Sequence, residues 1–155
     1  MAGVDRLVLA LQEVSFPGDL PGECDVGQIL KDFFSRPEVK TVMINMNQSQ
    51  LFDEQLNRYG TILGTYADKT ARHKRRRGLP DVHYTYYETG KTYDSLEVYA
   101  DDESVGIFPD ESAPEYANYA LDGSAWGLNN ENFAELVPEM RDAVVDGIRN
   151  FLTNG

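Results

Sequence analysis

The last part of the chain carries the clearest pattern in the sequence, a series of apolar residues that recur every three or four positions. This spacing is that of one side of an α-helix. Either Asn129 or Asn130 is suited to cap its start, because a short polar side chain can accept a hydrogen bond from a backbone N–H of the first turn. We therefore expect a long C-terminal amphipathic helix that runs to about Thr153. Its apolar residues are Phe133, Leu136, Val137, Met140, Val144, Val145, Ile148 and Leu152.

Shorter helical patterns come earlier in the chain. Asp25 is a suitable N-cap for a helix whose apolar residues begin at Val26, and Pro37 is suited to the first turn of a second helix that continues to about Asn47. Residues 1–24 are predicted to form a peripheral helix, over residues 4–11, and a loop that contains the Pro and Gly residues of the segment 16–22.

The middle of the chain changes from helical spacing to alternation. Residues 95–109 alternate apolar and polar side chains on either side of an acidic turn, which predicts an antiparallel β-hairpin. We expect a short extended segment over residues 48–53, a β-prone aromatic segment over 83–88 and a short helix over 115–121. The predicted order is helices, then a small antiparallel sheet, then helices again. This order indicates an α+β domain. So small a sheet needs a helix across one face or strands from a neighbour.

The composition limits the class of protein. A chain of 155 residues with 41% hydrophobic content is long enough for one domain with its own core, and we expect residues 1–155 to form a single domain. No apolar run approaches the ~18 residues that span a bilayer. The N-terminus lacks the pattern of a signal peptide, and one cysteine, Cys24, excludes an internal disulfide. We therefore expect a non-secreted protein with no membrane partner.

Charge is distributed very unevenly. The segment 69–77 contains six of the 14 Lys and Arg residues and no acid, whereas residues 78–155 contain three basic and sixteen acidic side chains. We expect residues 67–82 to form a basic extended loop. Cations gathered this closely repel one another, which favours an anionic partner, either a DNA backbone or an acidic protein surface. A solvated loop and a nuclear-localisation signal are the alternatives.

Aromatic residues near this basic segment extend the candidate interaction site. Alternation along residues 84–87 would place two tyrosines on the same side of a strand, where they could stack on bases if they shared a face with the arginines. Packing in the core and at its rim is the more common role for such residues, and Trp126 is open to the same two interpretations. The candidate interaction residues are Lys69, Arg72, Lys74, Arg75, Arg76, Arg77, Tyr84 and Tyr86.

Catalytic motifs are not evident. His73 and His83 are the only histidines, and neither belongs to a metal-binding pattern. Cys24 has no base placed near it in sequence, and the acids at 101–103 lack the spacing of an EF-hand. No GxSxG, Walker A or GxGxxG motif is present. We therefore expect no enzyme activity, no cofactor, no metal and no small-molecule substrate.

Six short pieces of sequence occur in a characteristic order. They are residues 47–52, 60–66, the basic segment from Thr70 to Gly78, residues 87–96, the acidic hairpin, and residues 126–131 with the helix that follows. This order resembles that of the neck or tail-completion proteins of tailed bacteriophages, especially those of phages of Bacteroidetes. The resemblance covers about residues 26–152, and Glu88 stands where the family pattern has Asp before Thr-Gly.

The resemblance implies a structural α+β subunit without catalytic residues. Such subunits form a ring at the head–tail junction, around the channel that DNA crosses. The implied partners are copies of the chain, neighbouring portal, adaptor and tail proteins, and the genomic DNA in the channel. The implied location is the virion, after synthesis in the host cytoplasm. The alternative is a small nucleic-acid-binding accessory protein that uses residues 72–77.

Overall fold

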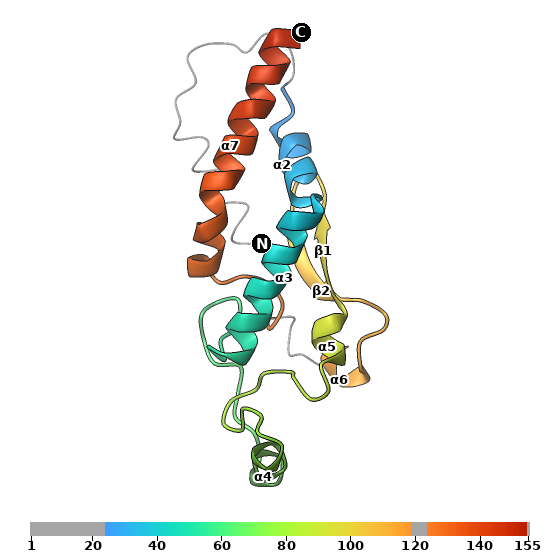
Figure 1. The fold of residues 1–155 in the computed structure, drawn as a ribbon, viewed down its shortest axis with the longest axis vertical. Coiled ribbons are helices and arrows are strands. Elements are labelled where there is room, and N and C mark those ends of the chain that lie inside the picture. The colour runs from blue at the N-terminus through green and yellow to red at the C-terminus, as the bar shows by residue number, and fades with distance from the viewer. Residues whose placement is uncertain (1–23, 119–123, 155) are drawn as a thin grey trace.

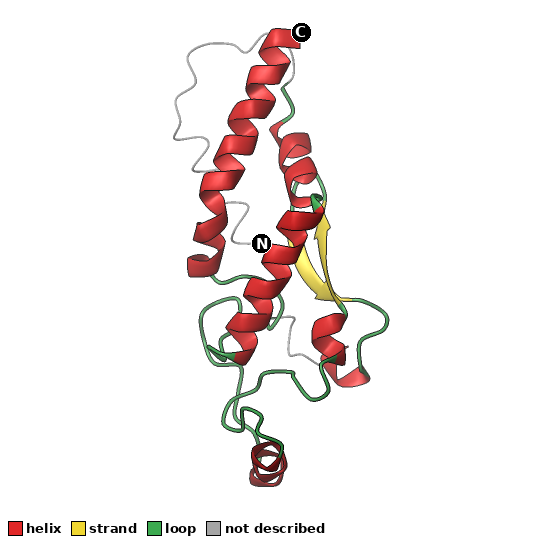
Figure 2. Cartoon of the chain, viewed as in Figure 1, coloured by secondary structure: helices red, strands yellow, loops and turns green. Residues whose placement is uncertain are grey.

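The computed structural model describes residues 24–118 and 124–154, and the helix and loop expected before residue 24 lie outside these ranges. The described chain is an α+β domain in which helices pack on a two-stranded antiparallel sheet (Figures 1 and 2). Its elements are α2 (Val26–Phe34), α3 (Pro37–Phe52), α4 (Asp68–Arg76), α5 (Lys91–Asp94), β1 (Leu96–Ala100), β2 (Val105–Pro109), α6 (Glu115–Asn118) and α7 (Asn130–Asn154).

Helices α2 and α7 begin at the caps that the sequence offers. The Asp25 carboxylate accepts a hydrogen bond from the backbone N–H of Gln28 at 3.0 Å, and the Asn129 side chain accepts one from that of Asn132 at 2.9 Å. Asn129, rather than Asn130, is therefore the cap of α7, and the expected end near Thr153 is confirmed. The two helices lie close together, since a Cβ built on Gly147 would stand 2.6 Å from Ile29.

Helix α3 continues to Phe52, so the expectation of an extended segment over residues 48–53 is wrong. The buried side of α3 includes the apolar residues Met43 and Leu51. It also includes two amides, Asn47 and Gln50, whose exposed fraction is 0%. These four positions follow helical spacing. Because two of them are polar, the apolar pattern stops a turn and a half before the helix does.

The predicted hairpin is confirmed. β1 and β2 pair antiparallel with Val98 opposite Ile107, and both side chains are buried on the inner face. On the outer face, Tyr99 and Phe108 are about half exposed with ring centroids 6.2 Å apart. The Asp101 carboxylate accepts hydrogen bonds from backbone N–H groups within the turn, and these lower its pKa. The acidic turn is thus closed by its own side chain.

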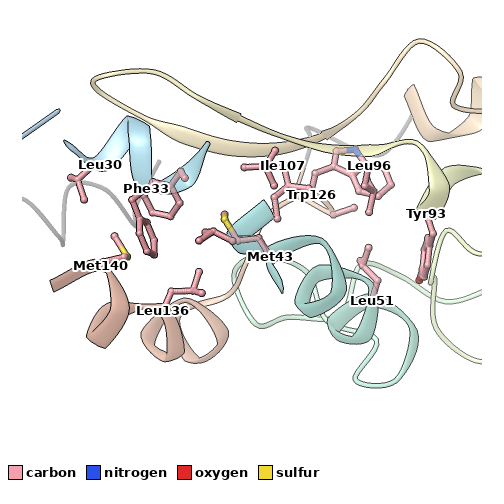
Figure 3. Close-up of a cluster of buried hydrophobic side chains, with 14 of the residues drawn as sticks. Leu30, Phe33, Met43, Leu51, Tyr93, Leu96, Ile107, Trp126, Leu136 and Met140 are labelled. Carbon is pink, nitrogen blue, oxygen red and sulfur yellow. The ribbon is translucent and has the colours of Figure 1, made fainter. Parts of the chain in front are cut away.

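Within the described residues, a hydrophobic core lies between the inner face of the hairpin and the helices α2, α3 and α7 (Figure 3). Phe33 of α2 and Met140 of α7 meet at one end of it, and Leu51 of α3 and Tyr93 of α5 lie toward the other. Trp126, only 4% exposed, fills the space beneath the sheet. Because the Trp126 ring is buried, it cannot stack on bases.

Two further expectations are corrected. Residues 67–82 are not an extended loop, because Asp68–Arg76 form α4. Lys and Arg have high helix propensity, and cations in the last turn interact favourably with the helix dipole. Residues 83–88 do not form a strand: a single bridge joins His83 to Thr65, and the φ of 55° at Tyr86 interrupts extended backbone. The short helix α6 is described over Glu115–Asn118.

Candidate interaction surface

Helix α4 stands at one end of the long axis of the molecule, apart from the core (Figure 1). Its buried anchor is Lys74, of which only 3% is exposed. The Lys74 ammonium donates a hydrogen bond to the backbone carbonyl of Tyr87 at 2.5 Å and lies 3.1 Å from a carboxylate oxygen of Glu88. It also sits over the ring of Tyr66, 4.8 Å from the centroid. A charge this buried requires such partners, so these contacts hold α4 in one place.

Glu88 joins the anchor to the end of the helix. It accepts a hydrogen bond from the guanidinium of Arg77, whose other nitrogen bonds the Glu88 backbone carbonyl at 2.6 Å. His73 lies 3.7 Å from the same carboxylate. Partial burial raises the pKa of Glu88, but the hydrogen bond from Lys74 and the charges of Lys74 and Arg77 outweigh it, so the net pKa is lowered. The carboxylate therefore stays charged at neutral pH.

A second acid, Asp81, forms an ion pair with Arg75 of the basic segment. Asp81 accepts a hydrogen bond from Arg75 at 2.7 Å. Asp81 and Glu88 are the only acids between Lys69 and Gly90, and both pair with the basic segment. Sequence reasoning missed them, although their isolation within this stretch was a signal that could have found them.

The cations that remain point away from the molecule. At about 100° per residue, Lys69, Arg72 and Arg76 fall on the side of α4 opposite Lys74. All three are exposed, and within residues 24–118 and 124–154 none of them forms an ion pair. We call them the basic stripe. Of the other predicted cations, Lys74 is a buried anchor, and Arg75 and Arg77 pair with acids of the same chain.

The predicted tyrosines do not line this stripe. Tyr84 and Tyr86 are half-buried members of an aromatic row that continues to Tyr66 on one side and Trp126 on the other. Neighbouring ring centroids in the row are between 4.9 and 6.5 Å apart. Tyr84 packs so closely on Gly64 that a Cβ there would stand 2.5 Å from its ring. The row connects the base of α4 to the core, which is the packing role that sequence reasoning weighed against base stacking.

Other features of the described chain offer little chemistry. An open hollow of about 470 Å³ lies between α3 and the segment from Leu79 to Tyr93, and there Ser49 donates to Asp53 at 2.7 Å. Within the described ranges no three His, Cys, Asp or Glu side chains are grouped to hold a metal ion. Nor does that part of the chain contain a helix long and apolar enough to cross a membrane.

Comparisons with known proteins return nothing: no family model, curated protein or solved structure matches this chain.

Proposed function

We propose that this protein is a structural subunit of a tailed bacteriophage, one that assembles with copies of itself into a ring at the junction of head and tail. The observation that carries the proposal is the separation of charge in an elongated subunit: a rigidly anchored cationic helix stands at one end of a chain whose net charge is −12. Such a subunit is suited to head-to-tail contacts, and contacts of this kind close into a ring where the rotation from one copy to the next returns to the first copy.

Contacts between the pieces of the resemblance support the proposal. Gln50, in the piece 47–52, accepts hydrogen bonds from the backbone N–H of Asn129 at 2.8 Å and from the side chain of Asn132 at 3.0 Å. Asn47 donates to the backbone carbonyl of Gly127 at 3.0 Å. The piece 87–96 supplies Glu88, which anchors the basic segment. Pieces far apart in sequence thus work together, as expected if they belong to one inherited pattern.

The small sheet offers a second way to meet a neighbour. Within the described ranges only two strands pair, and the alternation of an antiparallel ladder points the backbone groups of Val105 and Ile107 away from β1. Unpaired strand edges accept strands from other chains. In the proposed ring, a neighbouring subunit, portal, adaptor or tail protein would add to this edge, and the genomic DNA would pass through the centre.

The test is the location of the chain. Particles of a phage that carries this gene are purified, their proteins are identified by mass spectrometry, and a tag at the C-terminus is imaged by electron microscopy. We expect the chain in the virion at the collar, and multimers of the purified protein in solution. A chain that is absent from particles and monomeric in solution would contradict the proposal.

The basic stripe also favours a second candidate, an accessory protein that binds nucleic acid through phosphate contacts. It predicts that Lys69→Gln, Arg72→Gln and Arg76→Gln together abolish retention on a DNA column and reduce the salt dependence of binding by about three phosphate contacts. The matched control replaces Lys40, Lys91 and Arg141 by Gln, an equal change in charge. Equal retention of both triple variants and the parent would exclude this candidate.

A further inference from the structure

Helix α7 carries a row of acids along the side that faces away from the core. Glu131, Glu135, Glu139, Asp142 and Asp146 recur at intervals of three or four residues, and all are exposed. The buried residues of α7, from Leu136 to Ile148, lie on the opposite side. We call these five residues the acidic stripe. Asp146 is paired with Arg149 at 3.1 Å, whereas none of the other four has an ion pair within the described residues.

The two stripes cannot meet within one molecule. Helix α4 lies at one end of the long axis, and α7 runs from the middle to the other end (Figure 1). Because the long axis lies in the plane of Figure 1, the two helices are separated along it. A contact between the stripes therefore requires a second molecule.

The spacing of the two stripes matches. Read from Arg76 back to Lys69, the cations are separated by four and then three residues, as are Glu135, Glu139 and Asp142 read forward. Both rows span about 10 Å at 1.5 Å per residue. Two antiparallel helices would thus bring three cations opposite three carboxylates, with opposite helix dipoles side by side. A parallel alignment would place the cations opposite Glu139, Asp142 and Asp146. It fits less well, because Asp146 already forms an ion pair with Arg149.

We infer that the basic stripe of α4 docks antiparallel along the acidic stripe of α7 on the next copy of this chain. The inference rests on the proposed function and names the contact that function requires. Each copy presents a different surface to its two neighbours, so the contact repeats in one direction around a ring.

The experiment is a charge swap between two full-length variants. The first replaces Lys69, Arg72 and Arg76 by Glu, and the second replaces Glu135, Glu139 and Asp142 by Lys. Each variant alone brings like charges together, so we expect its self-association, measured by analytical ultracentrifugation at low salt, to weaken at least about tenfold. An equimolar mixture should recover association, because each reversed stripe then faces an opposite charge. A mixture that stays dissociated would overturn the inference.

Controls separate local contact from net charge. Asp102, Glu103 and Glu111 are exposed acids near the hairpin, and replacing them by Lys changes the charge as much as the α7 variant does. Replacing Lys40, Lys91 and Arg141 by Glu matches the α4 variant in the same way. We expect both controls to associate like the parent chain, and equal weakening in the controls would count against the inference. Circular dichroism verifies that every variant is folded.

A measurement on the unaltered chain makes the test independent of folding in the variants. Carbodiimide joins a lysine to a carboxylate only where the two are in contact, and isotopically mixed copies identify links between molecules by mass spectrometry. We expect an intermolecular link from Lys69 to Asp142 or Glu139. Links from Lys69 only to acids outside α7 would overturn the inference.

The outcomes separate this inference from the proposed function. If the parent chain multimerises and is present in particles but the charge variants behave like it, the inference fails and the proposed function stands. If the parent chain stays monomeric at every concentration and is missing from particles, both fail. If the α4 variant loses duplex DNA binding while self-association is unchanged, the stripe binds nucleic acid and the inference is overturned.

Discussion

At the scale of single residues, the pair Lys74–Glu88 decides where α4 stands. Removing one partner of a buried ion pair leaves a charge without compensation. Glu88→Gln should therefore lower the free energy of unfolding by about 1–2 kcal/mol, less than for a fully buried pair because the side chain of Glu88 is 35% exposed. Urea denaturation measures the change, with Glu111→Gln as the exposed control. A variant as stable as the parent would show that the anchor contributes nothing.

The same pair predicts a pH dependence. The folded pKa of Glu88 is lowered below its ordinary value of 4.5, so the stabilisation is complete above that value and is lost as the pH falls through the folded pKa. The difference in stability between the parent and Glu88→Gln should therefore shrink as the pH decreases from about 5 toward 3. Parallel denaturation curves at several pH values test this. A constant difference over that range would argue against a charged Glu88.

Gln50 is the other residue that we expect to contribute strongly to the stability of the fold. Its fully buried amide bonds the start of α7 and donates to the backbone carbonyl of Gly127 at 3.1 Å. Gln50→Ala leaves buried backbone groups without partners, and we expect a loss of about 2–4 kcal/mol in the free energy of unfolding. Asn45→Ala, an exposed amide of the same helix, should change stability by no more than about 0.5 kcal/mol. Equal effects of the two substitutions would contradict the role given to Gln50.

At the scale of elements, α7 contains an unusual residue for its length. Pro138 lies inside the helix and is exposed, and an internal proline removes a backbone hydrogen bond and crowds the preceding turn. Pro138→Ala should raise the free energy of unfolding by about 1–3 kcal/mol, reduced in part because alanine gives the unfolded chain more freedom. Thermal denaturation measures the change, and Glu139→Ala is the neighbouring control. A lower melting temperature would show that the proline is accommodated at no cost.

Elements with an apolar side were predictable from sequence, and elements defined by polar partners were not. The cap at Asp25 was predicted, and the cap of α7 was narrowed to Asn129 or Asn130, because capping acts over a few residues. The last turn of α3 was missed because Asn47 and Gln50 are buried by partners about 80 residues away. In the candidate site the cations could be identified from sequence. The burial of Lys74 could not, because it depends on the position that the fold gives to Glu88. Short-range patterns do not contain that information.

At the scale of the whole molecule, net charge and local charge make opposite predictions about salt. Copies with a net charge of −12 repel one another, so screening alone would increase association as salt is added. A contact between opposite stripes predicts the reverse, because the Debye length falls from ~10 Å at 0.1 M to ~3 Å at 1 M. We expect the average mass at fixed concentration to decrease across this range. Light scattering gives the sign of the change, and an increase would contradict a charge-complementary contact.

The buried amides of α3 have a further consequence for the order of folding. Asn47 and Gln50 bond groups 77 to 82 positions further along the chain, so these bonds at the start of α7 form only when a large loop has closed. Closing a loop of this size is entropically costly and slows folding. The hairpin and α2 can form from local contacts beforehand, whereas the docking of α7 on α3 belongs to the slow step. During translation, this step waits until the start of α7 has left the ribosome.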